Sequence, residues 1–231
     1  MLQINQINQY YGESHILWDL DLNVPEGSCT CLMGRNGVGK TTLLKSIIGL
    51  LPVRSGRITF NENDLSGMST AQRARAGIGY VPQGREIFPQ LTVEENLRTG
   101  LLGRSDGLRE IPDSIFQLFP VLKQMLGRRG GDLSGGQQQQ LAIGRALASG
   151  PRLLILDEPT EGIQPNIVHE IGDIIIKLNR EQSLTVLLVE QKLPFARRVA
   201  TAFDLMERGR VVASGNIAEL SEDLIQQHLA V

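Results

Sequence analysis

The sequence predicts an α/β protein that has an antiparallel β lobe at its start and an α-helical lobe inserted into a parallel-sheet core. Three observations support this prediction. Short alternating strands fill the first 33 residues, apolar strands alternate with helical stretches after residue 150, and the segment between is rich in helix formers. The 231 residues suffice for one domain with a large core, and 41% hydrophobic and 21% charged residues are typical of globular proteins.

Alternation and turn residues define the first half of the chain. We expect strands at Leu2–Ile4, His15–Val24, Ser28–Met33, Arg57–Phe60 and Ile78–Val81. Thr41–Gly49 has the spacing of a buried helix, which Gly49 and Pro52 end. Cys29 and Cys31 point to the same face of one strand, and we expect both to be reduced, buried thiols.

The second half begins with the expected helical lobe from Thr92 to about Ser149. Apolar strands are expected at Leu153–Asp157, Leu184–Glu190 and Phe203–Glu207, with helices at Asn166–Asn179 and Pro194–Thr201. Apolar runs all fall short of the roughly 20 residues needed to cross a bilayer, and the start lacks the pattern of a secretory signal. We therefore expect any membrane role to depend on docking to another subunit.

A glycine-rich segment with the sequence GRNGVGKT at positions 34–41 fits the phosphate-binding loop and lies between an expected strand and an expected helix. Glycines let backbone N–H groups turn onto phosphate oxygens, where the helix start adds its positive dipole end. Lys40 is expected to contact the β- and γ-phosphates, and the Thr41 hydroxyl to bind Mg²⁺. A chance match is expected in roughly one chain in a hundred of this length, so the motif predicts a nucleoside triphosphate site. Its predicted binding residues are Gly34, Arg35, Asn36, Gly37, Val38, Gly39, Lys40, Thr41 and Thr42.

A pair of acids ends the apolar strand at Leu153–Asp157. Ligands bind at the carboxyl ends of strands in open parallel sheets. Asp157 suits the Mg²⁺ shell, and Glu158 suits the general base that orients the attacking water. Alone, two acids after an apolar run would more often be a solvated strand end. Beside a phosphate loop they predict a metal ligand and a catalytic base.

Between these motifs the sequence LSGGQ at Leu133–Gln137 precedes a helical run, and its serine and two glycines form either an anion-binding nest or an ordinary helix cap. It resembles the signature of ATP-binding-cassette (ABC) ATPases. The resemblance covers essentially the whole chain, with Tyr11 at the adenine-stacking position and Gln83 at the glutamine loop. It implies a P-loop NTPase (RecA-like) core and a single ABC ATPase domain over residues 1–231. Its nucleotide-binding core with the β lobe would span 1–91 and 150–231, and its helical signature lobe 92–149.

The family resemblance also implies partners and roles. It implies a head-to-tail homo- or heterodimer in which ATP bound by one chain contacts the signature of the other. Gln83 would sense Mg²⁺ and the attacking water, and so would act both at the metal and in catalysis. The residues that would bind the partner's ATP are Ser134, Gly135, Gly136 and Gln137.

Two positions depart from the pattern of the family. Gln191 stands at the switch position that is usually histidine, and glutamine can hydrogen-bond a γ-phosphate but cannot carry a proton. Gln164 stands where aspartate is typical, in a loop that communicates across the dimer. We expect hydrolysis to persist, with Gln191 among the catalytic residues, because Lys40 and Glu158 are present.

One segment, Val81–Leu97, looks like the branch of bacterial importers of branched-chain amino acids, amides and urea. Asn8–Gly12 and Thr30–Lys40 look more like the urea-importer subunit, so uptake of a small nitrogenous solute, with urea as the first candidate, is the first hypothesis. Such importers imply a second ATPase subunit, transmembrane permease subunits and, indirectly, an external solute-binding protein, with this chain peripheral on the cytoplasmic face of the inner membrane. Residues 84–103 would help to dock the permease, the alternative being a solvated loop. Val231 comes soon after the last expected core elements, so we expect no appended regulatory domain.

Several alternatives remain open. A branched-chain amino-acid importer shares all the motifs, and an export or lipid-extraction ATPase shares the compact size. A regulatory subunit that barely hydrolyses ATP is favoured by Gln191 and Gln164 but disfavoured by Glu158. A cassette ATPase that acts on nucleic acid or the ribosome is disfavoured by the net charge of −2 and by the single cassette, so no nucleic-acid partner is expected.

Overall fold

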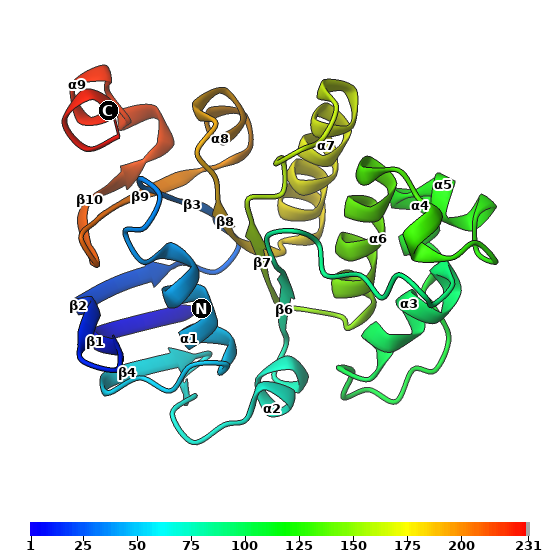
Figure 1. Cartoon of the computed structure of the whole chain (residues 1–231), viewed down its shortest axis with the longest axis horizontal. Helices are drawn as coiled ribbons and strands as arrows, with labels where there is room; N and C mark the ends of the chain where they lie inside the picture. Colours follow the sequence, from blue (N-terminus) through cyan, green and yellow to red (C-terminus); the bar gives the residue numbers. More distant parts are fainter. Residues whose placement is uncertain (230–231) are drawn as a thin grey trace.

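Two β-sheets and the helices around them make up residues 1–229, which is the part of the chain that the computed structural model describes (Figure 1). The last two residues of the predicted domain, 230 and 231, lie outside the described residues. The expectation that no regulatory domain is appended there also falls outside the described part of the chain. Figure 1 places the first sheet beside α1 at one side of the molecule and α3–α6 at the opposite side.

The first sheet is antiparallel, with strand order β2-β1-β4-β5, and confirms the expected β lobe. Its strands are β1 (Leu2–Tyr11), β2 (Ser14–Val24), β4 (Ser55–Phe60) and β5 (Asn63–Asp64). β1 is longer than predicted and pairs with β2 from Leu2↔Val24 to Tyr11↔Ser14. Alternation buries Leu2 and Ile4 in the core that contains α1 (Lys40–Ile48), and a register shift between Ile4 and Ile7 brings Ile7 to the same buried side.

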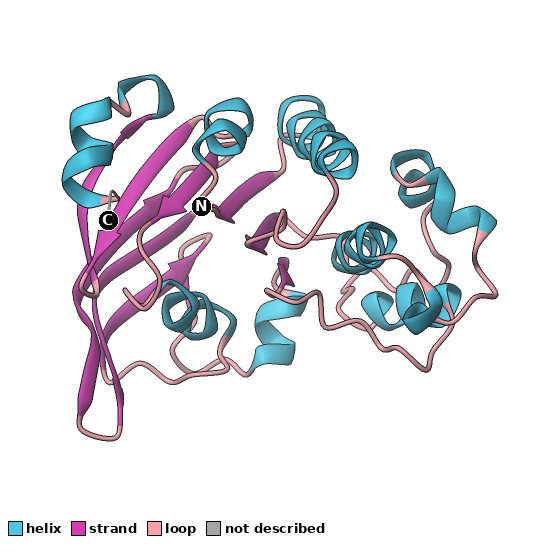
Figure 2. Ribbon diagram, turned by 45° about the horizontal axis from the view of Figure 1, so that its top comes forward, coloured by secondary structure: helices cyan, strands magenta, loops and turns pink. Residues whose placement is uncertain are grey.

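The second sheet has the order β10-β9-β3-β8-β7-β6, in which only β10 runs antiparallel to its neighbour among the described strands. Its strands are β3 (Cys29–Met33), β6 (Ile78–Val81), β7 (Leu153–Asp157), β8 (Thr185–Val189), β9 (Ala202–Glu207) and β10 (Arg210–Asn216). Helices cover both faces (Figure 2), so β7 and β8 are buried over their whole length and are largely apolar. Cys29 and Cys31 are free and fully buried on one face, as predicted, and Leu32 faces the other core.

The helices between β6 and β7 occupy the segment in which the helical lobe was predicted. They are α3 (Val93–Leu101), α4 (Asp113–Leu118), α5 (Pro120–Gln124), the 3-10 turn η1 (Gly130–Asp132) and α6 (Gly135–Ala148). α3 and α6 pack closely, since a Cβ at Gly100 would lie 2.1 Å from the Arg145 carbonyl oxygen. Their apolar side chains, such as Leu97 and Leu141, join the core beneath the parallel sheet. The exact lobe boundaries at 92 and 149 stay a prediction.

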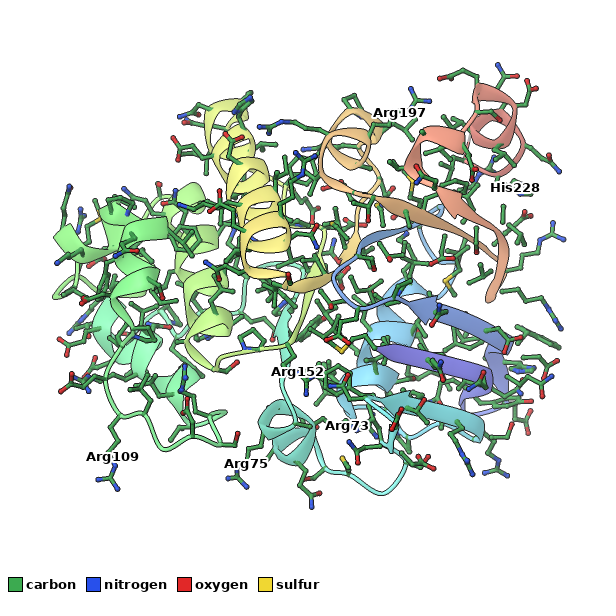
Figure 3. All side chains as sticks on the ribbon, turned by 180° about the vertical axis from the view of Figure 1, so that it is seen from behind. Arg73, Arg75, Arg109, Arg152, Arg197 and His228 are labelled. Atoms are coloured by element: carbon green, nitrogen blue, oxygen red, sulfur yellow. The ribbon has the colours of Figure 1, made fainter. Side chains whose placement is uncertain are left out.

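Other helices complete the core. The two predicted after β7 are α7 (Pro165–Gln182), which is longer than expected, and α8 (Leu193–Val199). The elements that the sequence did not predict are α2 (Thr70–Arg75), β5, β10, η2 (Ile217–Glu219) and α9 (Glu222–His228). Arg73 on α2 lies against α1 (Figure 3) and donates to the carbonyl oxygens of Ser46 at 2.7 Å and Ile47 at 2.8 Å. Within residues 1–229, we find no helix that combines the length and apolar character of a membrane span.

Candidate active site

The functional groups lie in a row along the carboxyl edge of the parallel sheet. β3, β8, β7 and β6 are neighbours in this order, and each is followed by a loop that carries one member of the row. The members are Asn36, Gln191, Glu158 and Gln83. Gln191 Nε2 donates to Asn36 Oδ1 at 2.7 Å and to Glu158 Oε1 at 2.5 Å, and Gln83 Nε2 donates to Glu158 Oε2 at 3.3 Å. The order of the hydrogen-bonded side chains is therefore the order of the strands.

The phosphate loop connects β3 to α1 in a conformation that needs glycine. Gly39 has φ of 111°, and a Cβ there would lie 3.0 Å from Met206 Cε and 3.1 Å from Leu17 Cδ2. Lys40 is 6% exposed, and its Nζ donates to the carbonyl oxygens of Gly34 at 2.7 Å and Arg35 at 2.9 Å. Burial lowers the pKa of Lys40, while the nearby Glu158 and Asp157 carboxylates act in the opposite direction. The loop thus holds a buried cation where the sequence predicts phosphates.

The predicted metal ligands Thr41 and Asp157 face each other, with Thr41 Oγ1 donating to Asp157 Oδ2 at 3.5 Å. Asp157 is 2% exposed, and burial, followed by repulsion from Glu158, raises its pKa to about 6. Lys40 and the Thr41 hydroxyl oppose that rise. A divalent cation would relieve the cost of this buried carboxylate, so the oxygen donors of this corner fit Mg²⁺.

Glu158, the predicted base, leaves the strand in an unusual backbone conformation. Its φ is 47°, in the left-handed region that costs a non-glycine residue about 1 kcal/mol or more. Its N–H still donates to Val189 O on β8 at 2.9 Å, so the strand pairing continues to this residue and the side chain then turns into the cavity. Strain of this kind is common at functional sites, where the surrounding structure holds it in place.

A cavity of about 420 Å³ lies over these groups. Its lining residues are Ile16, Asn36, Gly37, Gly39, Lys40, Thr41, Thr42, Gln83, Glu158 and Glu161. The sequence assigned no site role to Ile16 or Glu161. Glu161 Oε2 accepts a hydrogen bond of 2.8 Å from Gln83 Nε2, and its spacing of three residues after Glu158 is the one signal that could have indicated it. Ile16 lines the cavity because β2 passes beside the phosphate loop, and the sequence alone does not show this arrangement.

The predicted signature residues and the predicted adenine-stacking tyrosine do not line this cavity. Among the described residues, neither Tyr11 nor Ser134–Gln137 lines it. Tyr11 is 48% exposed at the end of β1. Ser134 caps α6 and its Oγ accepts a hydrogen bond from Gln137 N at 3.3 Å, while Ser134 N donates to Gln137 Oε1 at 3.0 Å. One chain therefore brings together the phosphate loop, the acids and the glutamines in its own cavity. The start of α6, which carries the signature, lies outside that cavity.

Gln164, the second departure from the family pattern, directly precedes α7. Within residues 1–229 its side chain makes no capping hydrogen bond, although aspartate is a preferred residue at that position. The roles predicted for the individual site residues remain predictions.

Comparisons with known proteins agree with this geometry. The family model described as "ABC transporter" matches residues 17–161. The high-affinity branched-chain amino acid transport ATP-binding protein BraG of Pseudomonas aeruginosa is 42% identical over 213 residues, which are 92% of this chain and 91% of that protein. The probable branched-chain amino acid transport ATP-binding protein LivF of Archaeoglobus fulgidus is 39% identical over 223 residues, which are 96% and 94% of the two chains.

A solved structure gives the same result for the fold. It is the dimeric post-hydrolysis state of the ATP-binding cassette MJ0796 bound to ADP and Pi. The TM-score is 0.84 and the sequence identity 26%, and the match covers 94% of this chain and 99% of that one. The predicted α/β architecture with a P-loop NTPase core is confirmed.

Proposed function

Since this chain belongs to the ABC transporter family of ATP-hydrolysing proteins, we propose that it is an ATPase subunit of an importer for branched-chain amino acids. Both relatives described above carry branched-chain amino acid transport in their names. The comparisons therefore favour this alternative over urea, for which they give no specific support.

The observation that carries the ATPase mechanism is the row of Asn36, Gln191, Glu158 and Gln83 beside Lys40. The phosphate loop would hold the phosphates, and Lys40 would turn from the Gly34 and Arg35 carbonyl oxygens to the β- and γ-phosphates. Glu158 would accept the proton of a water that attacks the γ-phosphate. The amides of Gln83 and Gln191 donate to both oxygens of this carboxylate, which fixes its direction.

Magnesium would be held by the Thr41 hydroxyl and Asp157, with Gln83, which lines the same cavity as Thr41, close by. When bound, Mg²⁺ would supply positive charge that neutralises the phosphates. Asp157 is suited to this task because burial and the neighbouring Glu158 outweigh the groups that favour its charged form, so a bound cation would stabilise the carboxylate.

A second chain would complete the site. Ser134–Gln137 are exposed or half-buried at the start of the 14-residue helix α6, away from the cavity of their own chain. Backbone N–H groups at a helix start favour an anion, so this signature would contact the phosphates of ATP bound by the partner. The dimeric state of the cassette bound to ADP and Pi supports this arrangement.

The permease would dock at a larger cavity of about 790 Å³, which α2, the end of α1 and the strand β6 line on one side and the helices α3 and α6 on the other. Residues from the predicted docking segment 84–103 line one side of it, among them the exposed Phe88 and Leu102. Arg85 in this segment donates to Gln138 Oε1 at 3.2 Å and to Gly162 O at 3.4 Å, so it connects the segment to the signature helix. Docking there would place the chain at the cytoplasmic face of the membrane as a peripheral subunit, with a solute-binding protein outside.

The test is uptake of labelled leucine and labelled urea, measured side by side in a strain that lacks this chain. We expect selective loss of leucine uptake, which wild type restores and Lys40→Ala does not. Selective loss of urea uptake would keep the ATPase mechanism and return the solute to urea. If both solutes enter normally, the importer proposal is wrong.

A further inference from the structure

A buried carboxylate stands beside the site without lining the nucleotide cavity that the described residues form. Glu190 follows β8 directly and is 3% exposed. Its Oε2 accepts a hydrogen bond of 2.6 Å from Thr160 Oγ1. Its Oε1 accepts the backbone N–H groups of Gln191 at 2.8 Å and Lys192 at 3.0 Å. A buried charge needs such partners, and here all of them belong to two loops of the site.

The two loops are linked in both directions. Thr160, which is fully buried, donates its hydroxyl hydrogen to Glu190, and its carbonyl oxygen accepts from Lys192 Nζ at 2.9 Å. Thr160 lies two residues after Glu158, and Glu190 lies one residue before Gln191. The carboxylate therefore connects the backbone that carries the predicted base to the backbone that carries the switch glutamine.

This connection affects how well the Gln191 side chain can make its two hydrogen bonds. Its side chain is exposed and flexible by nature, yet its Nε2 contacts Asn36 Oδ1 and Glu158 Oε1 at the same time. Fixing the Gln191 N–H reduces the number of positions that the side chain can sample, so the entropy lost in making both contacts is smaller.

We propose that Glu190 is a positioning residue for ATP hydrolysis, whose buried carboxylate fixes the loop after β8 so that Gln191 bridges Asn36 and Glu158. The inference rests on the roles proposed above for Gln191 and Glu158. Glu190 acts through Gln191 and does not itself contact the reacting groups.

A double-mutant cycle on the full chain tests this inference. Steady-state ATPase rates at varied Mg·ATP are measured for wild type, Glu190→Gln, Gln191→Ala and the double variant. We expect each single change to lower kcat about tenfold with less than about a twofold change in KM, and the double variant to match Gln191→Ala. If the two losses multiply in the double variant, Glu190 does not act through Gln191 and the inference is wrong.

The remaining outcomes separate the inference from the proposed function. If Gln191→Ala lowers kcat and Glu190→Gln does not, the inference alone fails. If Gln191→Ala keeps the wild-type kcat, the proposed role of Gln191 fails and the inference falls with it. If Glu190→Gln does not fold, Thr160→Val replaces it in the cycle, because it removes the hydroxyl donor at nearly constant size. Thr160→Ser should then restore most of the rate.

Asp204 provides a matched control. Its carboxylate is 5% exposed and accepts the hydroxyl hydrogen of Ser214, as Glu190 accepts that of Thr160. It lies on β9 and is not among the described residues that line the nucleotide cavity. Asp204→Asn should leave kcat within about twofold of wild type. An equal loss of kcat in Asp204→Asn and Glu190→Gln would show a general effect of buried acids, and would overturn the positioning role.

Discussion

Replacing Asp157 with asparagine is expected to stabilise the protein when nucleotide and metal are absent, although it removes the predicted Mg²⁺ ligand. Asp157 is 2% exposed, and burial with repulsion from Glu158 raises its pKa from 3.8 to about 6. A carboxyl group with a raised pKa in the folded state destabilises that state when it ionises. The rise corresponds to at most about 3 kcal/mol, because one pKa unit equals about 1.4 kcal/mol.

The sign of the pH dependence follows from proton release. Below about pH 4, Asp157 is protonated in both the folded and the unfolded chain and this penalty is absent. Between about pH 4 and pH 6 the unfolded chain releases the proton first, so the contribution of Asp157 to the free energy of unfolding falls as the pH rises. Above about pH 6 the loss is complete. Asparagine has no proton to release, so the advantage of Asp157→Asn should grow through this window and then stay constant.

The assay is urea denaturation in EDTA without nucleotide, from about pH 4.5 to pH 8, with wild type and Asp157→Asn compared at each pH. Glu13→Gln, an exposed acid in the β1–β2 turn, is the control and should change the free energy of unfolding by less than about 0.5 kcal/mol. In a separate series without EDTA, Mg·ADP should stabilise wild type more than Asp157→Asn, because the ligand binds the folded state. A variant that is less stable than wild type at about pH 7.5, or a stability difference that is constant with pH, would refute the reasoning.

Three further predictions concern the other parts of the site and its support. Glu158→Gln should lower ATP turnover at least about 100-fold and keep ATP binding, so that an ATP-bound dimer accumulates in size-exclusion chromatography; a wild-type rate would exclude Glu158 as the base. Arg73→Met should lower the free energy of unfolding by about 3 kcal/mol in thermal denaturation, because buried carbonyl oxygens lose their donor. The control is Arg75→Met at an exposed neighbouring position, which should keep the free energy of unfolding within about 0.5 kcal/mol of wild type. Gln191→His should give an ATPase rate that falls relative to wild type as the pH rises through about 6.5, since imidazole then loses one donor; a ratio constant with pH would contradict this.

The sequence predicts the buried strands well, and the reason is physical. Ile78–Val81 and Leu153–Asp157 were predicted with the bounds that the structure gives, because strands covered on both faces are apolar runs that turn residues delimit. β10 was missed because its residues alternate between exposed and half-buried, which leaves a weak hydrophobic signal. α2 and α9 have six and seven residues, too few to show a helical period.

The site also has parts that local sequence patterns predict and parts that depend on how the strands are arranged. The phosphate loop and the acid pair are local patterns, so their residues could be named from the sequence. The contacts of Gln191 with Asn36 and of Gln83 with Glu158 depend on which strands are neighbours, and the order β3-β8-β7-β6 is not the order of the chain. Ile16 was missed for this reason, because it reaches the cavity through the arrangement of β2 beside the phosphate loop, whereas Glu161 lies in the same loop as Glu158 and was missed although its spacing is local.

The replacement of the usual histidine by Gln191 has a structural rationale in this row of side chains. One amide nitrogen donates both of its hydrogens, one to Asn36 and one to Glu158, whereas a neutral imidazole has a single N–H to donate. The amide does not titrate, so the donor side of both contacts does not change with pH. A flexible glutamine lacks the stiffness of a ring, and the fixed backbone that Glu190 provides would compensate for that loss. The residue that departs from the family pattern and the buried acid that precedes it are therefore best understood as one unit.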